Sequence, residues 1–326
     1  MASRAGSAGS AGPAYLGLDI GGTNIKYGVV DAGGAMLWQD RVATPVVRPV
    51  PVLAIKDIAA AALDRAVRAG QAIAGLGVAA PGRVDSAAGL VLEASNLRWG
   101  REQLGDLLED KLGLPVRVLN DTNAAALGEY VAGGWPSPGA DLICISIGTG
   151  VGAGLIMGGE LYAGESFNAG ELGHVIAVPA GRECACGGTG CLETIASGPG
   201  IVRSYLEARA GAGEPAGDAA PGEVTLAVVA AAARAGQEPA ITALSSAAAA
   251  LGVQVANCRT LLDVSHFVIG GGVANIGWPL VPEIGRVASR YLSAARQPRL
   301  AVRKSAMIDR AAIVGAVSYL REHLCA

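Results

Sequence analysis

Short apolar runs alternate along the chain with stretches whose apolar side chains recur at helical spacing. The runs at 15–20, 74–82 and 115–121 end in a glycine turn or a polar pair, which is typical of buried strands. Residues 57–69 have helical apolar spacing, and 266–277 indicate a strand, three glycines and the start of a helix. Strands that alternate with helices predict an α/β fold.

One part of this pattern occurs twice. Residues 15–31 predict an apolar strand, a turn of glycine and threonine, and a second apolar strand. Residues 141–161 follow the same order. This approximate duplication predicts a molecule with two related halves.

Two uncharged stretches are long enough to raise the question of a membrane span. Residues 239–258 contain serine, glutamine and asparagine, and residues 142–159 are interrupted by glycines. A spanning helix needs about 20 strongly apolar residues, and alanine and serine contribute little to transfer into lipid. The pattern therefore favours a buried helix and a buried hairpin, and no membrane partner.

Two segments have the composition of unstructured chain. Residues 1–14 are rich in glycine, alanine and serine and have no apolar core of a signal peptide, so we expect a disordered tail on a cytoplasmic protein whose thiols stay reduced. Residues 207–223 have low complexity, which predicts a mobile surface loop.

Composition narrows the classes of function. Hydrophobic residues make up 51% of the chain but aromatic residues only 4%, so the core is built from small aliphatic side chains. The formal net charge of -3 gives no polycationic surface. Binding to the phosphate backbone of nucleic acid is therefore disfavoured.

The glycine turns of the two halves are candidates for binding phosphate. The sequences are "DIGGTN" at 19–24 and "GTGVG" at 148–152. Glycine lets backbone N–H groups approach an anion, and threonine adds a hydroxyl donor. Tight hairpins also need glycine, so a structural role stays open, but the matching positions favour phosphate. Neither turn has the pattern of a Walker loop or a dinucleotide-binding fingerprint.

A polar pair follows the predicted strand at 115–121. Asn120 and Asp121 stand at its carboxyl end, where ligands bind in α/β sheets. An aspartate there is suited to accept a proton from an attacking hydroxyl. The alternative is that Asp121 caps the helix that follows.

Three cysteines and a histidine lie close together in the sequence. His174 is followed by Cys184, Cys186 and Cys191, a donor set suited to tetrahedral zinc. Cys-x-Cys spacing strains a disulfide, although a redox centre or inert reduced thiols stay open. The other cysteines and histidines have no such partners in the sequence, and we interpret them as core, terminal or structural residues: Cys144, Cys258, Cys325, His266 and His323.

Several motifs in order make the chain resemble the ROK family of bacterial sugar kinases and repressors. They are "LDIGGTNIKYGVVD", "APG", "SNLRW", "NDTNAAALGEY", "IGTGVGAG", "ELGH", "CACGGTGCLE", "ASG" and "VIGGG". The resemblance extends over about residues 15 to 320. It implies an actin-like, hexokinase-type (ribonuclease H-like) fold with two lobes and a cleft.

The resemblance also implies how the chain divides. A small N-terminal α/β lobe would comprise 15–122, with a C-terminal helix at 305–326 packing back on it. A large lobe at 123–304 would contain the zinc site. Family members commonly form dimers, so we expect a homodimer.

In the family, ATP with Mg²⁺ phosphorylates a sugar hydroxyl, usually O6 of a hexose, and the resemblance assigns roles to matching residues. Asp121 would be the general base. Sugar contacts would come from Gly82, Asn96, Asn120, Asp121, Glu171, His174 and Glu193. Nucleotide contacts would come from Asp19, Gly21, Gly22, Thr23, Asn24, Lys26, Gly148, Thr149, Gly150, Gly270, Gly271 and Gly272. Structural Zn²⁺ would be bound by His174, Cys184, Cys186 and Cys191, with the other ring nitrogen of His174 directed at substrate.

The substrate and the class of function have alternatives. Glucose is the first expectation, and an amino sugar or a cyclitol would fit the same polar residues. "ASGPGIV" at 196–202 departs from the glucokinase pattern just after Glu193, which leaves the choice of sugar open. ATP and polyphosphate are not distinguished as donors. A sugar-responsive regulator would need a helix-turn-helix, where only the short tail precedes Asp19, and an actin-like filament would not need the cysteines.

Overall fold

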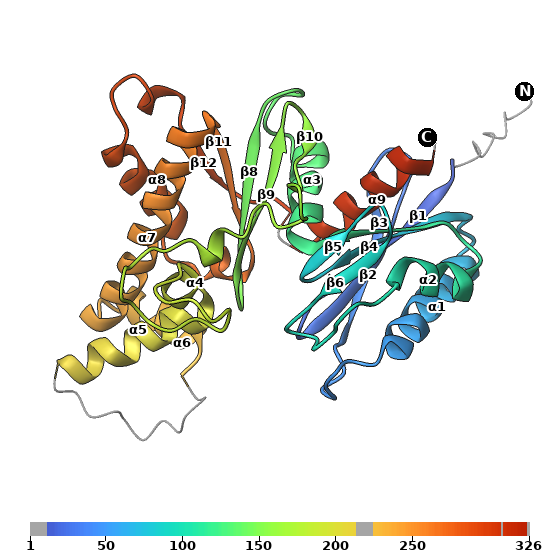
Figure 1. Ribbon diagram of the computed structural model, residues 1–326, viewed down its shortest axis with the longest axis horizontal. Coiled ribbons are helices and arrows are strands. Elements are labelled where there is room, and N and C mark those ends of the chain that lie inside the picture. Colours follow the sequence, from blue (N-terminus) through green and yellow to red (C-terminus); the bar gives the residue numbers. More distant parts are fainter. Residues whose placement is uncertain (1–11, 213–223, 308, 325–326) are drawn as a thin grey trace, which may run out of the picture. The chain divides into compact units, whose positions relative to one another are not determined.

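The computed structural model describes residues 12–212, 224–307 and 309–324 (Figure 1). These residues form two compact units: the first unit comprises the described residues up to 121 together with 316–324, and the second unit comprises those from 122 to 315. The chain crosses between them inside two helices, α3 (Asp121–Ala132) after Asp121 and α9 (Ala311–Leu324) after Gly315.

The first unit is built on a five-stranded sheet in the order β3-β2-β1-β4-β7. Its strands are β1 (Ala14–Ile20), β2 (Asn24–Val30), β3 (Met36–Ala43), β4 (Ile73–Ala80) and β7 (Val116–Asn120). Strand β1 is antiparallel to β2 and parallel to β4, which is parallel to β7. A small hairpin of β5 (Arg83–Asp85) and β6 (Leu90–Glu93) adjoins it.

Helices cover both faces of this sheet (Figure 1). Helices α1 (Val52–Arg68) and α2 (Leu104–Leu112) pack on one face, where Leu16, Leu18 and Val78 are buried. The C-terminal part of α9 packs on the other. A Cβ on Gly77 would lie 2.3 Å from the carbonyl oxygen of Ala316, so α9 can approach the sheet only because this residue has no side chain.

The second unit has a sheet in the order β10-β9-β8-β11-β12. Its strands are β8 (Leu142–Ile147), β9 (Val151–Met157), β10 (Glu160–Leu161), β11 (His266–Gly270) and β12 (Ala301–Lys304). Packed around it are α4 (Glu193–Ala196), α5 (Gly198–Gly211), α6 (Leu226–Arg234), α7 (Glu238–Leu262), α8 (Leu280–Tyr291) and the short 3-10 helices at Leu172–His174, Gly272–Asn275 and Gln297–Arg299.

The alternating side chains of β8 and β9 separate the two faces of this second sheet. Ile143, Ile145 and Ile147 join the main core, which includes α7 and α8. On the opposite face, a Cβ on Gly154 would lie 2.5 Å from the Cβ of Ala126, so α3 packs directly against the backbone of β9. Small residues thus let helices approach both sheets closely.

The predicted duplication is confirmed by the topology. In each sheet three antiparallel strands are followed by two parallel ones, and the strand orders correspond one to one. The fold is the α/β, two-lobed actin-like or hexokinase-type class that the resemblance implied.

The uncharged stretches form the predicted buried helix and hairpin. Residues 239–258 lie within α7, and 142–159 form strands β8 and β9 with their turn. By length and composition α7 could cross a membrane, but 56% of its most apolar window is buried inside the protein. That burial is typical of a core helix.

Three expected boundaries differ from the structure. Most of the expected tail lies outside the described residues, and β1 already begins at Ala14. The expected loop at 207–223 is wrong for residues 207–211, which continue α5, while 213–223 lie outside the described residues. The C-terminal helix begins at Ala311 because β12 and a short turn come first.

Candidate functional site

The first glycine turn joins β1 to β2 and is held through its carbonyl groups. Thr44 Oγ1 donates to the Gly21 carbonyl at 2.6 Å, and Arg48 Nη2 donates to the Gly22 carbonyl at 3.2 Å. Thr44 is buried, so this anchor is shielded from water. The turn predicted at 19–24 is therefore a fixed element of the first unit.

Asp19 and Lys26 face each other across the two strands of this turn. They are paired in the register of β1 and β2, and Lys26 Nζ lies 3.9 Å from Asp19 Oδ2. Both side chains are partly exposed. A carboxylate and an ammonium group thus stand together at the base of the candidate phosphate turn, with Thr23 and Asn24 in and just after it.

The "SNLRW" segment places Asn96 over this turn. A Cβ on Gly22 would lie 3.6 Å from Asn96 Nδ2. The segment is fixed by buried Leu97 and by Trp99, which is 4% exposed and whose indole N–H donates to the Val50 carbonyl at 2.7 Å. Buried neighbours therefore hold an exposed amide beside the glycine turn.

The carboxyl ends of β4 and β7 bring Gly82, Asn120 and Asp121 together. Asn120 Nδ2 donates to the Gly82 carbonyl at 2.8 Å and to Asp121 Oδ1 at 3.1 Å. Gly82 has φ +84°, and a Cβ there would lie 2.0 Å from the Glu93 carbonyl, so only glycine fits. Asp121 is the first residue of α3, and the amide of Asn120 orients its carboxylate.

The second glycine turn, between β8 and β9, is held by a carboxylate. Val151 N–H donates to Glu193 Oε2 at 2.9 Å, and Gly198 N–H donates to the Gly148 carbonyl at 2.8 Å. A Cβ on Gly150 would lie 2.6 Å from the same Glu193 oxygen. Glu193, a predicted sugar ligand, thus has one oxygen on the turn.

A cavity of about 580 Å³ opens beside this second turn. Its lining residues are Gly148, Thr149, Gly198, Pro199, Val202, Arg203, Leu206, Val224, Leu226, Gly272 and Val273. Within the second unit it brings together the predicted nucleotide residues Gly148, Thr149 and Gly272. Gly270 ends β11 and Gly271 follows it, and neither is among the lining residues.

Sequence reasoning missed the wall of this cavity that α5 provides. Pro199, Val202, Arg203 and Leu206 recur at helical spacing on one face of that helix. The sequence interpretation connected Pro199 with the sugar because it follows Glu193, but it lines the cavity that contains Thr149 and Gly272. The helical spacing from Pro199 onward was the available signal.

The histidine and the three cysteines converge on one point. Their ligand atoms in His174, Cys184, Cys186 and Cys191 all lie within 4.8 Å of one another. The Cys186 and Cys191 sulfurs are 3.7 Å apart, and the Cys184 sulfur is 3.7 Å from His174 Nδ1. A tetrahedral zinc with Zn–S bonds of about 2.3 Å separates its sulfurs by about 3.8 Å. The donors therefore fit zinc in type, number and spacing.

Burial gives these thiols unequal acidity. It is the main reason why the pKa of Cys191 is raised to about 12, with hydrogen bonds from the neighbouring thiols adding to it. A hydrogen bond from the Gly188 backbone is the main cause that lowers the pKa of exposed Cys186. Three thiolates this close together need a cation to offset their repulsion, which agrees with a metal site.

His174 presents its two ring nitrogens to different partners. Nδ1 points to the Cys184 sulfur, and Nε2 lies 3.8 Å from Glu171 Oε2. With Nδ1 on a metal ion, Nε2 would carry its hydrogen toward that carboxylate. Glu171 and His174 thus form a polar pair directly beside the cysteines.

Comparison with known proteins agrees with these motifs. The model of the ROK family matches residues 15–323. The chain belongs to the ROK family.

Three proteins in the ROK comparison illustrate its range. A glucokinase from Streptomyces coelicolor is 37% identical over 94% of this chain and 97% of its own. A ROK family glucokinase from Streptomyces griseus, solved in complex with glucose and AMPPNP, is 36% identical over 95% of this chain and 99% of its own, with a TM-score of 0.81. A ROK family transcriptional regulator, a homologue of the Escherichia coli MLC protein, is 27% identical over 95% of this chain and 78% of its own, with a TM-score of 0.83.

Proposed function

We propose that the chain is an ATP-dependent hexose kinase that transfers the γ-phosphoryl group to O6 of glucose. The observation that carries this proposal is the similarity, over nearly the whole length of both chains, to a ROK glucokinase solved with glucose and AMPPNP. The arrangement of Gly82, Asn120 and Asp121 supports it chemically.

Asp121 is the proposed general base. Its carboxylate accepts the proton of the sugar hydroxyl, the hydroxyl oxygen attacks the γ-phosphorus, and the bond to the β-phosphate oxygen breaks to release ADP. The Asn120 amide bonded to Oδ1 keeps the carboxylate oriented. An alcohol is a poor nucleophile, so the reaction needs a base that removes the hydroxyl proton during attack.

The remaining predicted residues would bind the two substrates. Asn96, Asn120, Gly82, Glu171, His174 and Glu193 would contact the sugar hydroxyls. The turns around Gly22 and Thr149 would bind the phosphates, and the cavity beside Gly272 would hold the nucleoside. Mg²⁺ would enter with ATP near Asp19.

A bound zinc ion would stabilise the structure without taking part in the reaction. Four protein ligands leave no open coordination position for water or substrate. His174, Cys184, Cys186 and Cys191 would hold it, and their loop would fix the imidazole beside Glu171. We also propose that the enzyme works in the cytoplasm as a homodimer.

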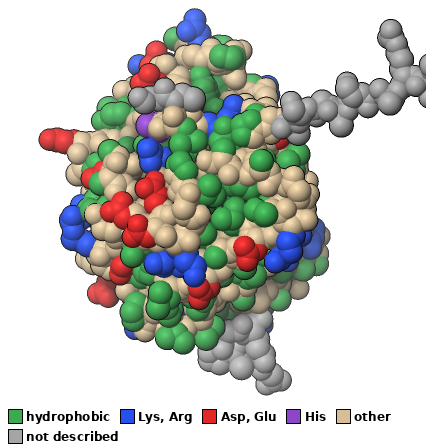
Figure 2. All heavy atoms as spheres, turned by 90° about the vertical axis from the view of Figure 1, so that its right-hand side faces the viewer, with side chains coloured by type: hydrophobic (Ala, Val, Ile, Leu, Met, Phe, Trp, Pro, Cys, Tyr) green, Lys and Arg blue, Asp and Glu red, His purple; other side chains and the backbone are tan. Residues whose placement is uncertain are grey.

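A regulator is the alternative from another class, since a ROK transcriptional regulator shares the fold. On the face shown in Figure 2, acidic, basic and apolar side chains are interspersed among the described residues, without one continuous basic surface. Binding to DNA phosphates needs clustered Lys and Arg side chains, and the formal net charge of -3 also favours the kinase.

A screen of ADP release from ATP tests the proposal. We expect release with glucose, less with amino sugars and cyclitols, and none without sugar; polyphosphate in place of ATP tests the donor. Faster release with an amino sugar or a cyclitol would change the proposed substrate and leave the proposed kinase activity unchanged. No release with any sugar, together with a sugar-dependent gel shift of DNA, would establish the regulator instead.

A further inference from the structure

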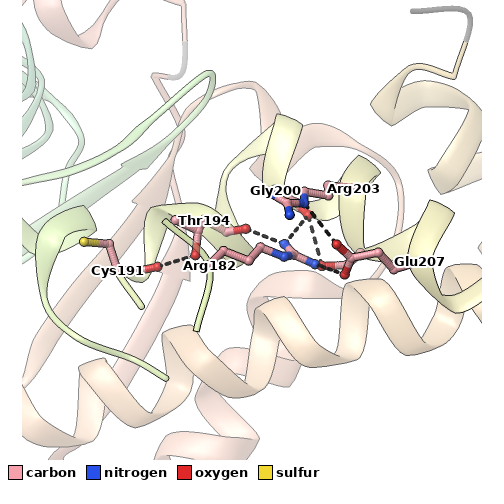
Figure 3. A network of polar contacts seen from close by, with 7 residues as sticks. Arg182, Cys191, Thr194, Gly200, Arg203 and Glu207 are labelled. Carbon is pink, nitrogen blue, oxygen red and sulfur yellow. Dashed lines mark hydrogen bonds and ion pairs between the residues drawn. The ribbon is translucent and has the colours of Figure 1, made fainter. Parts of the chain in front are cut away.

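Arg182 lies between the cysteines and the cavity beside the second glycine turn. Its backbone belongs to the cysteine loop, where Gly190 N–H donates to the Arg182 carbonyl at 2.8 Å. Its side chain leaves that loop and reaches α4 and α5 (Figure 3). The side chain is 17% exposed, so most of its surface is packed inside the second unit.

This guanidinium holds two successive helices at once. Nη1 donates to the carbonyls of Thr194 at 2.5 Å and Gly200 at 3.3 Å. Nη2 donates to Ser204 Oγ at 2.9 Å and to Glu207 Oε2 at 2.6 Å. One planar group thus fixes α4 and two turns of α5, which a single lysine donor would not do.

Two neighbouring faces of helix α5 contact different parts of the second unit. Gly200, Ser204 and Glu207 face Arg182, whereas Pro199, Val202, Arg203 and Leu206 line the cavity. Glu207 connects the two faces, because its Oε1 accepts from Arg203 Nε at 3.0 Å while its Oε2 accepts from Arg182. Arg203 is the one charged side chain among the described lining residues.

The exposures of Arg182, Arg203 and Glu207 indicate which residue holds the Glu207 carboxylate in place. Arg203 and Glu207 are 61% and 54% exposed, and an exposed ion pair of this kind contributes little to stability. Such a pair alone does not immobilise Arg203. The shielded Arg182 lowers the pKa of Glu207 more than Arg203 does and holds the carboxylate in place.

We propose that Arg182 is a positioning residue for the nucleotide: from the cysteine loop it fixes the wall that α5 gives to the cavity and, through Glu207, the place of Arg203. The inference rests on the proposed function, in that the cavity beside Thr149 is taken to bind the nucleoside of ATP. Through Arg182 the cysteine loop would influence the binding of ATP, and through His174 it would contact the sugar.

Calorimetric titration with AMPPNP and Mg²⁺, and separately with glucose, tests this role. We expect Arg182→Gln to weaken AMPPNP binding about tenfold, with glucose affinity within about twofold of wild type. Glu207→Gln should weaken AMPPNP binding in the same direction, and the double variant should add little because both residues serve one contact chain. Arg286→Gln is the matched control, since Arg286 pairs with Glu283 on α8 away from the cavity.

The outcomes separate the two proposals. Wild-type protein that binds no AMPPNP would overturn the proposed function and this inference together. Normal AMPPNP affinity in Arg182→Gln and Glu207→Gln, with wild-type protein binding well, would overturn the positioning role alone. An equal loss of glucose and AMPPNP affinity would also overturn it. Should Arg182→Gln fail to fold, exposed Glu207→Gln decides the question by itself.

Discussion

The two units share a sheet topology, but the side chains that hold their glycine turns bind opposite kinds of backbone group. The first turn is held through its carbonyls by a hydroxyl and a guanidinium, from Thr44 and Arg48. The side chain that holds the second turn is the carboxylate of Glu193, which accepts from an amide N–H, while a backbone N–H donates to the Gly148 carbonyl. The two units therefore share a backbone topology, whereas different kinds of side chain hold the two turns.

The buried polar groups differ in the same sense. Among the described residues the first unit buries no ionisable side chain, whereas the second buries Glu129 and Arg259. The Cys/His cluster also lies in the second unit, and the candidate base Asp121 in the first. In the proposed function, the first unit would thus supply the general base, and the second would supply the ligands of a structural zinc ion.

Replacing the candidate base is the strongest way to break this comparison. We expect Asp121→Ala to lower kcat by about 10³-fold, because general base catalysis contributes about 10² to 10⁴. Glucose and AMPPNP should still bind in calorimetry. Asp57→Ala, which removes an exposed partner of Lys111 in the same unit, is the control and should keep normal kcat. Substantial turnover in Asp121→Ala would show that Asp121 is not the general base.

Removing a ligand of the proposed zinc ion in the second unit should give the next largest effect. Purified protein should contain about one zinc per chain. Cys184→Ser should lose zinc and lower Tm by roughly 10 °C, because metal binding contributes directly to folding. Cys258→Ser, at a half-buried thiol on α7, should keep its zinc. Wild-type protein without zinc, and as stable as Cys184→Ser, would contradict the assignment.

The smallest effect concerns Glu129 and pH. Burial raises the pKa of this carboxyl above its ordinary value, although Ser305 donates a hydrogen bond to it. A raised folded-state pKa stabilises the protein below the unfolded pKa, near 4.5, and that contribution is lost as pH rises through the folded value. Glu129→Gln should therefore gain stability relative to wild type as pH rises above about 4.5.

Urea unfolding at several pH values measures this difference. Exposed Glu160 on β10 offers the control, and Glu160→Gln should run parallel to wild type across the range. A constant difference between Glu129→Gln and wild type would show that Glu129 keeps an ordinary pKa. The second unit would then hold its buried carboxylate without electrostatic cost.

Much of the fold was readable from the sequence because strand ends here coincide with glycines or polar pairs. Asp19 before "GGTN" and Asn120 with Asp121 mark two such ends, and the cysteine spacing pointed to the metal cluster. The helical spacing on α5 was visible in the sequence, but it did not identify a cavity wall, because apolar spacing looks the same whether a helix faces core or ligand. Arg182 was missed for another reason: its partners lie 12 to 25 residues further along and become neighbours only after folding.

The burial of Trp99 gives the first unit a built-in optical reporter. This indole is 4% exposed, donates its N–H to a backbone carbonyl, and stands three residues after Asn96, the candidate sugar contact beside the glycine turn. A shielded indole emits at shorter wavelength than a hydrated one, and its emission changes with the polarity around it. The segment that would meet the sugar thus contains one of the chain's four tryptophans, and we expect its emission to respond when sugar fills the proposed site.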